Sequence, residues 1–372
     1  MEQITSFFRE NQSVLANCLA FFSEKPDNLC FFDIETTGLS PAISSLYLIG
    51  AAVWENDGFQ IVQWFADDYV SEKELLLAFA SFSASCTAFV HYNGASFDIP
   101  YLEKKYARYH LPSPFQGKTS IDLYRSLPKN KSFFSVPNRQ LTSMEKLLHF
   151  HRTDTFTGKE CIQLYTEFMH KKYFRDPAAK ERKKQLARHN LEDIQGTVLC
   201  AQLLSYVYGV FSPLCVEQIL PEKETSPWLL KGQLAHGYFP VNSQSAWTLA
   251  ENEICCRYEQ NTLSVEISPF YGMLYHYFKD YKDYFYLPRE DTAIHKSVGA
   301  YVDRQYRRPA TASTCYIKKQ GSFFALPKNF PSENIPLFRE THKSRQLYIE
   351  ASSLSSLSEN QLIYLLNSFR GK

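Results

Sequence analysis

The stretch that decides the fold is Phe31-Phe32-Asp33-Ile34-Glu35-Thr36-Thr37-Gly38-Leu39. A strand turns successive side chains to opposite faces, so Asp33 and Glu35 share one face. Two neighbouring carboxylates at the end of an apolar strand repel each other, and burying them unpaired is costly. A cation removes that cost, and hard oxygen ligands of this kind suit Mg²⁺ or Mn²⁺. The alternative is a solvent-facing strand end with two ordinary acids, but the Thr-Thr-Gly turn that follows favours a metal site.

A second acidic segment lies further along the chain. The stretch 91–98 reads HYNGASFD, which predicts a strand ending at His91, a turn through Gly94, and a helix that begins near Asp98. An acid at a helix N-terminus is stabilised by the helix dipole, so simple capping is the alternative role for Asp98. Asn93 either contacts a substrate or shapes its own turn.

A third segment reads His189-Asn190-Leu191-Glu192-Asp193 and lies in a stretch with helical spacing. His189 and Asp193 are four residues apart, so they lie on one face of the predicted helix. Such a pair in isolation is usually a surface pair. In company with the two acidic segments, it becomes a candidate part of the same site.

Together the three segments resemble the motifs of the DEDD exonuclease superfamily, whose DnaQ-like members have a ribonuclease H-like fold. The residue pattern of 29–205 is similar, more specifically, to that of the YprB-like ribonuclease H-like domains of bacteria. The stretches Ser120–Arg125 and Leu141–Leu148 also look like that subfamily. The resemblance covers a little under half of the chain.

The resemblance implies four metal ligands and one base. Asp33, Glu35, Asp98 and Asp193 would hold two Mg²⁺ or Mn²⁺ ions, and His189 would act as the general base or orient the attacking water. The histidine branch of the superfamily usually places its histidine five residues before the last aspartate, and the tyrosine branch places its tyrosine four before. This chain has a histidine at the tyrosine spacing, so we expect tyrosine-branch geometry with a substituted side chain.

The function implied is a metal-dependent 3′–5′ exonuclease that hydrolyses single-stranded DNA or RNA by a two-metal mechanism. One alternative is a catalytically weak nucleic-acid-binding module that keeps the ribonuclease H-like fold. Another is a nuclease of short oligonucleotides. The sequence leaves DNA and RNA open, because the contacts that sense a 2′-hydroxyl are not identifiable in it.

Basic residues are expected to hold the substrate, because four acids repel a polyanion. Between residues 171 and 188 the chain has eight Lys or Arg against two acids. We expect Lys183 and Lys184 from this run, with Thr36, Thr37 and Asn93 beside the site, to bind substrate. The alternative is an ordinary solvated helix face.

The chain is predicted to be α/β, with a ribonuclease H-like mixed sheet flanked by helices in residues 1–210. Apolar runs and turns between residues 29 and 65 predict a three-strand antiparallel meander, followed by helices at 71–86 and 99–109 and a strand at 87–91. Apolar residues at helical spacing predict an N-terminal helical cap over 1–26. Residues 140–208 are predicted to be mostly helical.

Residues 211–225 are predicted to be a proline-containing linker, and residues 226–372 a smaller, β-rich α+β domain of unknown role. Six tyrosines crowd that domain between Tyr271 and Tyr286, interleaved with Lys279 and Lys282. Aromatic rings among cations could stack bases and bind phosphates along a single strand. The alternative is tyrosine-rich packing beneath β-structure.

Composition limits the classes of protein to which the chain can belong. The chain has 372 residues, 44% hydrophobic and 21% charged, and a net charge near +1, which excludes a generally basic nucleic-acid coat. Its longest apolar run, residues 46–54, is too short to cross a bilayer. Nine scattered cysteines and the absence of a signal-peptide pattern predict reduced thiols and a cytoplasmic location. No membrane partner and no obligate protein partner is expected.

Overall fold

The computed structural model describes residues 1–9, 28–127, 129, 134, 136–204, 209–220, 223–234, 245–249 and 253–370. Within these ranges the chain divides into two compact units. The N-terminal unit ends at Gly209 and the C-terminal unit begins at Val210. No helix in the described ranges combines the length and the apolar character needed to cross a membrane.

A six-stranded mixed sheet forms the centre of the N-terminal unit. Its strands, in the order β1-β4-β3-β2-β5-β6, are β1 (Glu2–Phe8), β4 (Gly58–Phe65), β3 (Leu46–Glu55), β2 (Leu29–Thr36), β5 (Ala88–His91) and β6 (Thr119–Asp122). Strands β2, β3 and β4 pair antiparallel, whereas β2, β5 and β6 are parallel. The predicted meander and the predicted mixed α/β sheet are therefore confirmed.

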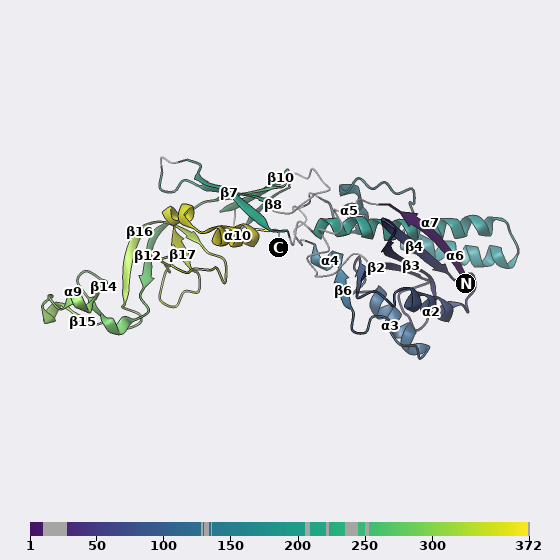
Figure 1. The fold of residues 1–372 in the computed structure, drawn as a ribbon, viewed down its shortest axis with the longest axis horizontal. Coiled ribbons are helices and arrows are strands. Elements are labelled where there is room, and N and C mark those ends of the chain that lie inside the picture. The colour runs from purple at the N-terminus through teal and green to yellow at the C-terminus, as the bar shows by residue number, and fades with distance from the viewer. Residues whose placement is uncertain are drawn as a thin grey trace. The chain divides into compact units, whose positions relative to one another are not determined.

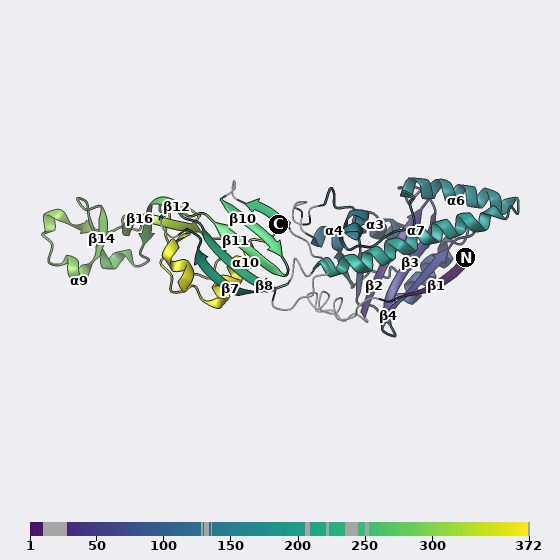
Figure 2. The same cartoon turned by 90° about the horizontal axis from the view of Figure 1, so that it is seen from above.

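Helices cover both faces of this sheet (Figure 1). They are α2 (Glu72–Phe82), α3 (Asp98–Arg108), α4 (Leu123–Ser126), α5 (Leu141–Leu147), α6 (Gly158–Tyr173) and α7 (Ala178–Cys200), followed by the 3-10 helix η4 (Ala201–Leu204). Helices α2 and α3 lie on one face, and α7 crosses the other with α6 beside it (Figures 1 and 2). The predicted helices at 71–86 and 99–109 are confirmed, and so is the mostly helical region from residue 140 as far as residue 204; residues 205–208 lie outside the described ranges.

Strand β2 is central, and all of its residues except Asp33 are buried, as expected for a strand covered on both faces. On the α2 side, Phe32 packs against Phe79 and Phe89 with ring centroids 5.5 and 5.6 Å apart. The opposite face of β2 carries Asp33 and Glu35 toward α7. The core thus fixes the strand that presents the two acids.

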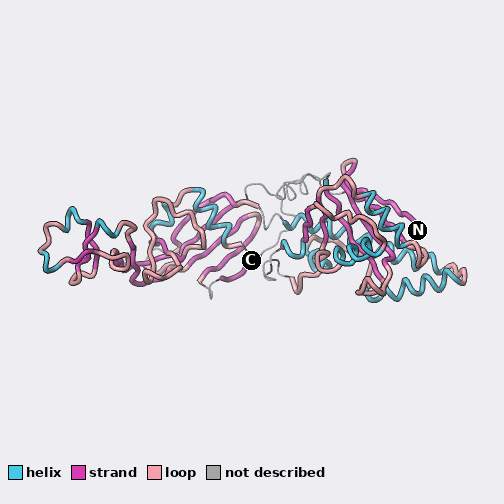
Figure 3. The backbone as a smooth tube through the Cα atoms, turned by 90° about the horizontal axis from the view of Figure 1, so that it is seen from below, coloured by secondary structure: helices cyan, strands magenta, loops and turns pink. Residues whose placement is uncertain are grey.

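The C-terminal unit consists mainly of strands (Figure 3). One sheet has the order β7-β8-β11-β10-β9 and two three-stranded sheets have the orders β12-β16-β17 and β14-β13-β15. The strands are β7 (Phe211–Gln218), β8 (Trp228–Leu234), β9 (Ser245–Leu249), β10 (Ile254–Glu259), β11 (Thr262–Ile267), β12 (Phe270–Tyr277), β13 (Tyr284–Leu287), β14 (Thr292–His295), β15 (Arg308–Pro309), β16 (Tyr316–Ala325) and β17 (Tyr348–Glu350). Short helices α9 (Lys296–Gly299), η6 (Tyr281–Asp283), η7 (Arg304–Tyr306) and η8 (Ala351–Ser356) connect them, and α10 (Glu359–Ser368) packs on β7 and β8.

Two predictions about element boundaries are wrong. Residues 2–8 form strand β1 rather than a helix, because they pair along their whole length with β4; the rest of the expected helical cap, residues 10–26, lies outside the described residues. The predicted linker 211–225 contains β7, an edge strand whose register shifts beside Pro213. A proline is tolerated at such a bulge on an edge strand, so it does not mark a linker here.

Candidate metal centre

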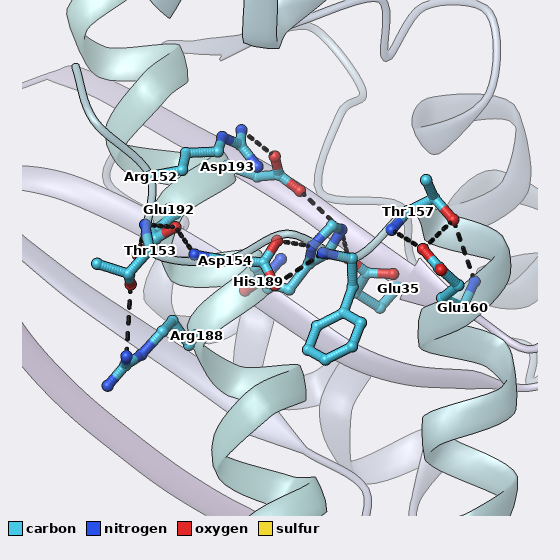
Figure 4. Close-up of polar contacts among 12 residues, drawn as sticks. Glu35, Arg152, Thr153, Asp154, Thr157, Glu160, Arg188, His189, Glu192 and Asp193 are labelled. Carbon is cyan, nitrogen blue, oxygen red and sulfur yellow. Dashed lines mark hydrogen bonds and ion pairs between the residues drawn. The ribbon is translucent and has the colours of Figure 1, made fainter.

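Strand β2 and helix α7 bring three predicted residues together. One ligand atom from each of Glu35, His189 and Asp193 lies within 4.8 Å of the others. The His189 Nε2 atom is 3.5 Å from Oε1 of Glu35 and 3.4 Å from Oδ2 of Asp193 (Figure 4). The four-residue spacing on α7 therefore places His189 and Asp193 on one face toward the strand, as predicted.

Asp33 is fixed by a side chain that the sequence analysis did not select. The Asn190 amide donates to Oδ2 of Asp33 at 2.9 Å, and its own oxygen accepts a bond from Gln63 of β4. A Cβ built at Gly50, which pairs with Asp33 in the sheet, would lie 2.1 Å from the Asn190 oxygen. Gly50 therefore makes room for the amide that orients Asp33.

Asp98 is the first residue of α3, as predicted. Burial raises the pKa of its carboxyl to about 7; hydrogen bonds from the backbone amides of Asp98 itself and of Ile34 oppose that rise, and the charge of Asp193 adds to it. The bond from Ile34 brings the carboxyl to β2, and no side-chain cap bond forms at the start of α3. Asp98 thus contributes to the acidic centre, rather than only capping its helix.

The acids of the centre repel one another. Burial, followed by the charges of Asp193, Asp98 and Glu35, raises the pKa of Asp33 well above its ordinary value. Burial also raises the pKa of Glu35 to about 7, against the opposing effect of His189.

Such a set of crowded carboxylates fits a site for hard divalent cations, because bound positive charge favours the ionised forms that burial and repulsion disfavour. All four acids offer oxygen ligands, which Mg²⁺ and Mn²⁺ prefer. The donor chemistry therefore matches the predicted ions.

His189 has a second carboxylate partner on its other ring nitrogen. Its Nδ1 atom lies 2.6 Å from Oδ2 of Asp154, so Nε2 is directed to Glu35 and Asp193. Burial lowers the pKa of the imidazole, but a hydrogen bond with the Cys161 thiol and the charges of Glu35 and Asp193 raise it more, to about 11. The charges of those two acids therefore favour the protonated ring in the metal-free protein.

Three consecutive residues, Arg152 to Asp154, hold this part of α7; we call them the 152–154 segment. The backbone amides of Thr153 and Asp154 and the Thr153 hydroxyl donate to the carboxylate of Glu192 (Figure 4). Asp154 bonds His189, and Arg152 forms an ion pair with Asp193. With the bond from Arg188 to Thr153, the segment thus contacts four residues of α7 between positions 188 and 193.

Arg152 also pairs with a buried acid, Glu145 of α5, through two hydrogen bonds of 2.5 and 2.6 Å. A Cβ built at Gly196 would lie 1.8 Å from the Glu145 carboxylate, so α7 needs a glycine at that turn. The guanidinium therefore joins a structural carboxylate to a proposed metal ligand.

The predicted substrate contacts beside the acids take part in turns. The Thr36 hydroxyl donates to the Gly38 carbonyl at 2.9 Å, and the Thr37 hydroxyl accepts from the Ser45 amide at 2.8 Å. Asn93 adopts a left-handed backbone with φ of 63°, and its backbone amide donates to Asp122. The turn-shaping role of Asn93 is therefore present, and the residue is exposed.

Some of the basic residues between 171 and 188 are already paired with acids, and others are not. Lys183 forms an ion pair with Glu2 of β1 and lies over the Phe65 ring, and Arg182 pairs with Glu167. Lys184 and Arg188 are exposed and make no ion pair among the described residues. Lys183 thus has a structural partner, while Lys184 remains available for a polyanion.

Three residues at the centre were missed from sequence: Asn190, Arg152 and Asp154. Asn190 directly follows the predicted site residue His189, so its position in the sequence could have identified it. Arg152 and Asp154 lie in an irregular loop with no periodicity to orient them, and only the folded chain places them on α7.

Comparisons with known proteins give a family match and a curated relative. Residues 30–205 match the family RNase_H_2, described as RNase_H superfamily. A curated Bacillus subtilis (strain 168) protein, "Uncharacterized protein YprB", is 34% identical over 97 residues, which are 26% of this chain and 23% of that protein. The chain thus spans about a quarter of the length of that relative.

Solved structures with similar folds include the family B DNA polymerase of Pyrobaculum calidifontis, at 18% identity and a TM-score of 0.36 over 48% of this chain and 25% of the polymerase. E. coli exonuclease I in complex with a dT13 oligonucleotide matches at 14% identity and a TM-score of 0.30, over 62% of this chain and 55% of that one. Residues 30–205, a little under half of the chain, thus match the RNase H superfamily, and the mixed sheet with helices on both faces fits a ribonuclease H-like fold.

Proposed function

We propose that this chain is a metal-dependent 3′–5′ exonuclease that hydrolyses phosphodiester bonds of single-stranded DNA or RNA with two Mg²⁺ or Mn²⁺ ions. The observation that carries the proposal is the convergence of Glu35, His189 and Asp193 within 4.8 Å. Asp33 and Asp98 complete it, since the pKa values of both carboxyls respond to the charge of Asp193.

The chemistry assigns a role to each group. When bound, two divalent ions lower the pKa of the attacking water and stabilise the leaving oxygen. The chain's own carboxylates neutralise and position those ions. His189 is to accept a proton at Nε2 once the charges of Glu35 and Asp193 are neutralised, because those charges, added to a hydrogen bond with the Cys161 thiol, raise its pKa in the metal-free protein.

The substrate is held mainly by its backbone. Lys184 and Arg188 are exposed on α7, the helix that carries His189 and Asp193, and Arg188 contacts Thr153 of the 152–154 segment. Lysine and arginine contacts to phosphates carry little sequence information, so we expect weak sequence preference.

A time course with end-labelled single strands tests the proposal. Purified protein is incubated with 5′-labelled DNA and with 5′-labelled RNA, in Mn²⁺ and in EDTA, and products are separated by length. We expect a metal-dependent ladder that shortens from the 3′ end, and its loss in Asp33→Ala and Asp193→Ala. Asp291→Asn, which removes an acid from the C-terminal unit, is the matched control. Full activity in either alanine variant would remove the two-metal mechanism.

The second candidate is a nucleic-acid-binding module with little hydrolysis. The ion pair between Arg152 and Asp193 favours it, because a guanidinium on a proposed ligand opposes cation binding. Retained binding of single strands without cleavage in Mn²⁺ or Mg²⁺ would support this candidate over the exonuclease.

A further inference from the structure

The C-terminal unit contains a cavity of about 740 Å³ that the centre on β2 and α7 does not use. Its walls come from the end of β12 with the turn that follows, residues 276–281, and from the loop 332–342. The groups that can recognise a ligand are Tyr277, Lys279, Tyr281, Glu333, Arg339 and His342.

The two walls are tied together by hydrogen bonds. The backbones of Tyr275 and Arg339 exchange two bonds of 2.9 Å, and the His276 ring bonds the Leu337 carbonyl at 2.8 Å. Phe338 exchanges two further backbone bonds with Tyr348 of β17. The cavity is therefore held open by the sheet, as expected for a largely pre-formed binding site.

The fixed charges of the cavity favour an anion. Lys279 and Arg339 make no ion pair within the described part of the chain, and Glu333 is the one acid among the lining residues. Lys318 and Lys319 of the neighbouring strand β16, by contrast, are neutralised by Asp291 and Glu350. Two unneutralised cations in a concave site are suited to phosphate groups.

The tyrosines of this region divide into two sets. Tyr286 and Tyr316 donate to Asp291, and Tyr284 stacks on Phe278 at 4.6 Å, so these rings serve the fold. Tyr277 lines the cavity and is partly exposed, and its ring lies edge-on to His342 at 5.2 Å and to Tyr316 at 5.4 Å.

The cavity lies at the end of an exposed row of side chains. Strand alternation places Tyr271, Met273 and Tyr275 on the same face of β12 as Tyr277, and the first two are 47% and 42% exposed. A row of exposed aromatic and thioether groups leading to cations suits a chain of bases and phosphates better than one small anion.

We propose that this surface binds a single-stranded nucleic acid, with phosphates on Lys279 and Arg339 and bases against the Tyr277 side of β12. The inference rests on the proposed nuclease function, because this surface would bind the polymer that the nuclease cleaves. It assigns a substrate-binding role to the C-terminal unit.

Fluorescence anisotropy of a labelled dT15 strand, measured in EDTA with the full chain, tests the inference. The double variant Lys279→Ala/Arg339→Ala should bind at least about fivefold more weakly, and the slope of log K against log salt should fall by about 1.4 for two lost phosphate contacts. The control Lys282→Ala/Lys343→Ala removes the same charge at the residues that directly follow the two walls and do not line the cavity, and should bind within about twofold of the unmodified chain. Lys279→Glu alone, at an exposed side chain, gives a second readout should the double variant fail to fold.

Competition separates a polymer from a nucleotide. Unlabelled dT15 should displace the labelled strand, and dTMP at equal nucleotide concentration should not. Equal displacement by dTMP, or unchanged affinity in the cavity variant, would overturn the inference. Cleavage is measured separately in Mn²⁺: cleavage with unchanged binding in the variant rejects only the cavity, whereas weakened binding without cleavage by the unmodified chain rejects only the nuclease.

Discussion

The Nδ1 atom of His189 lies 2.6 Å from Oδ2 of Asp154, a residue 35 positions earlier in the chain. The carboxylate accepts from Nδ1–H, so the other ring nitrogen is directed to Glu35 and Asp193. A histidine held in this way presents one defined nitrogen to the acidic centre.

Replacing Asp154 should therefore lower turnover without removing substrate binding. We expect Asp154→Ala to reduce kcat about 10–100-fold, the range seen when an outer partner of a metal-site residue is lost, with KM nearly unchanged. The kcat of Asp154→Asn, which can still accept a hydrogen bond from Nδ1–H, should lie between those of Asp154→Ala and the unmodified chain. Steady-state cleavage of a labelled strand measures this, and unchanged kcat in the alanine variant would show that the ring is positioned by other contacts.

Divalent cations should stabilise the N-terminal unit. At a concentration 100 times Kd, Mn²⁺ would add about 2.7 kcal/mol to the free energy of unfolding, and Asp193→Asn should lose most of that gain. Thermal unfolding in EDTA and in Mn²⁺ measures the shift independently of cleavage. Equal shifts in the variant and the unmodified chain would place the cation elsewhere.

The same acids should destabilise the protein when no cation is bound. Because burial raises the pKa of Glu35 to about 7 in the folded state, its charge opposes folding progressively above its ordinary pKa of 4.5, and fully above about pH 7. Glu35→Gln should thus raise Tm in EDTA at pH 8, by about 2–4 °C for each kcal/mol of relieved burial and repulsion, with a smaller gain at pH 5. A lower Tm at pH 8 would contradict this account.

Gly50 should be essential for the orientation of Asp33 rather than for folding. In Gly50→Ala the new Cβ would overlap the Asn190 oxygen, so the bond from Asn190 to Asp33 should be lost and cleavage should fall at least about tenfold. Gly158→Ala is the matched control, since a Cβ there meets nothing within 4 Å. Equal activity of the two variants would show that Asp33 needs no support from Asn190.

Arg152 should matter to stability through Glu145. Arg152→Ala would leave the Glu145 carboxylate, 1% exposed, without its charged partner, and removing one member of a buried pair costs about 3–5 kcal/mol. Arg152→Met with Glu145→Met should recover most of that loss in urea unfolding. Tighter Mn²⁺ binding by the double variant would show that Arg152 competes with the cation for Asp193.

The Asp291 cluster should make the C-terminal unit acid-sensitive. Hydrogen bonds from Tyr286 and Tyr316 lower the pKa of Asp291 to about 2, so its stabilising contribution is complete above the ordinary value of 3.8 and is lost as pH falls toward 2. Asp291→Asn keeps a residue that tolerates the left-handed backbone found there and removes the charge. The difference in Tm between the two proteins should shrink between pH 5 and pH 2; a constant difference would assign it to packing.

The amino-acid sequence by itself determined which side chains share a face. The alternation of a strand places Asp33 and Glu35 together, and a four-residue helical spacing places His189 with Asp193, because both periodicities are properties of the local backbone. Local signals were wrong in two places. Helical spacing predicted a helix at residues 2–8, which instead pair with β4, and a proline predicted a linker at residues 211–218, which instead pair with β8.

Only the tertiary structure decided what meets these faces. Asp154 reaches His189, Arg152 reaches Asp193 and Asn190 fits over Gly50 because loops and neighbouring strands bring distant residues together. Such contacts depend on how α7 packs across the sheet, and an irregular loop carries no periodicity from which that position can be read. The acids of the centre were therefore visible in the sequence, and the groups that orient and neutralise them were visible only in the fold.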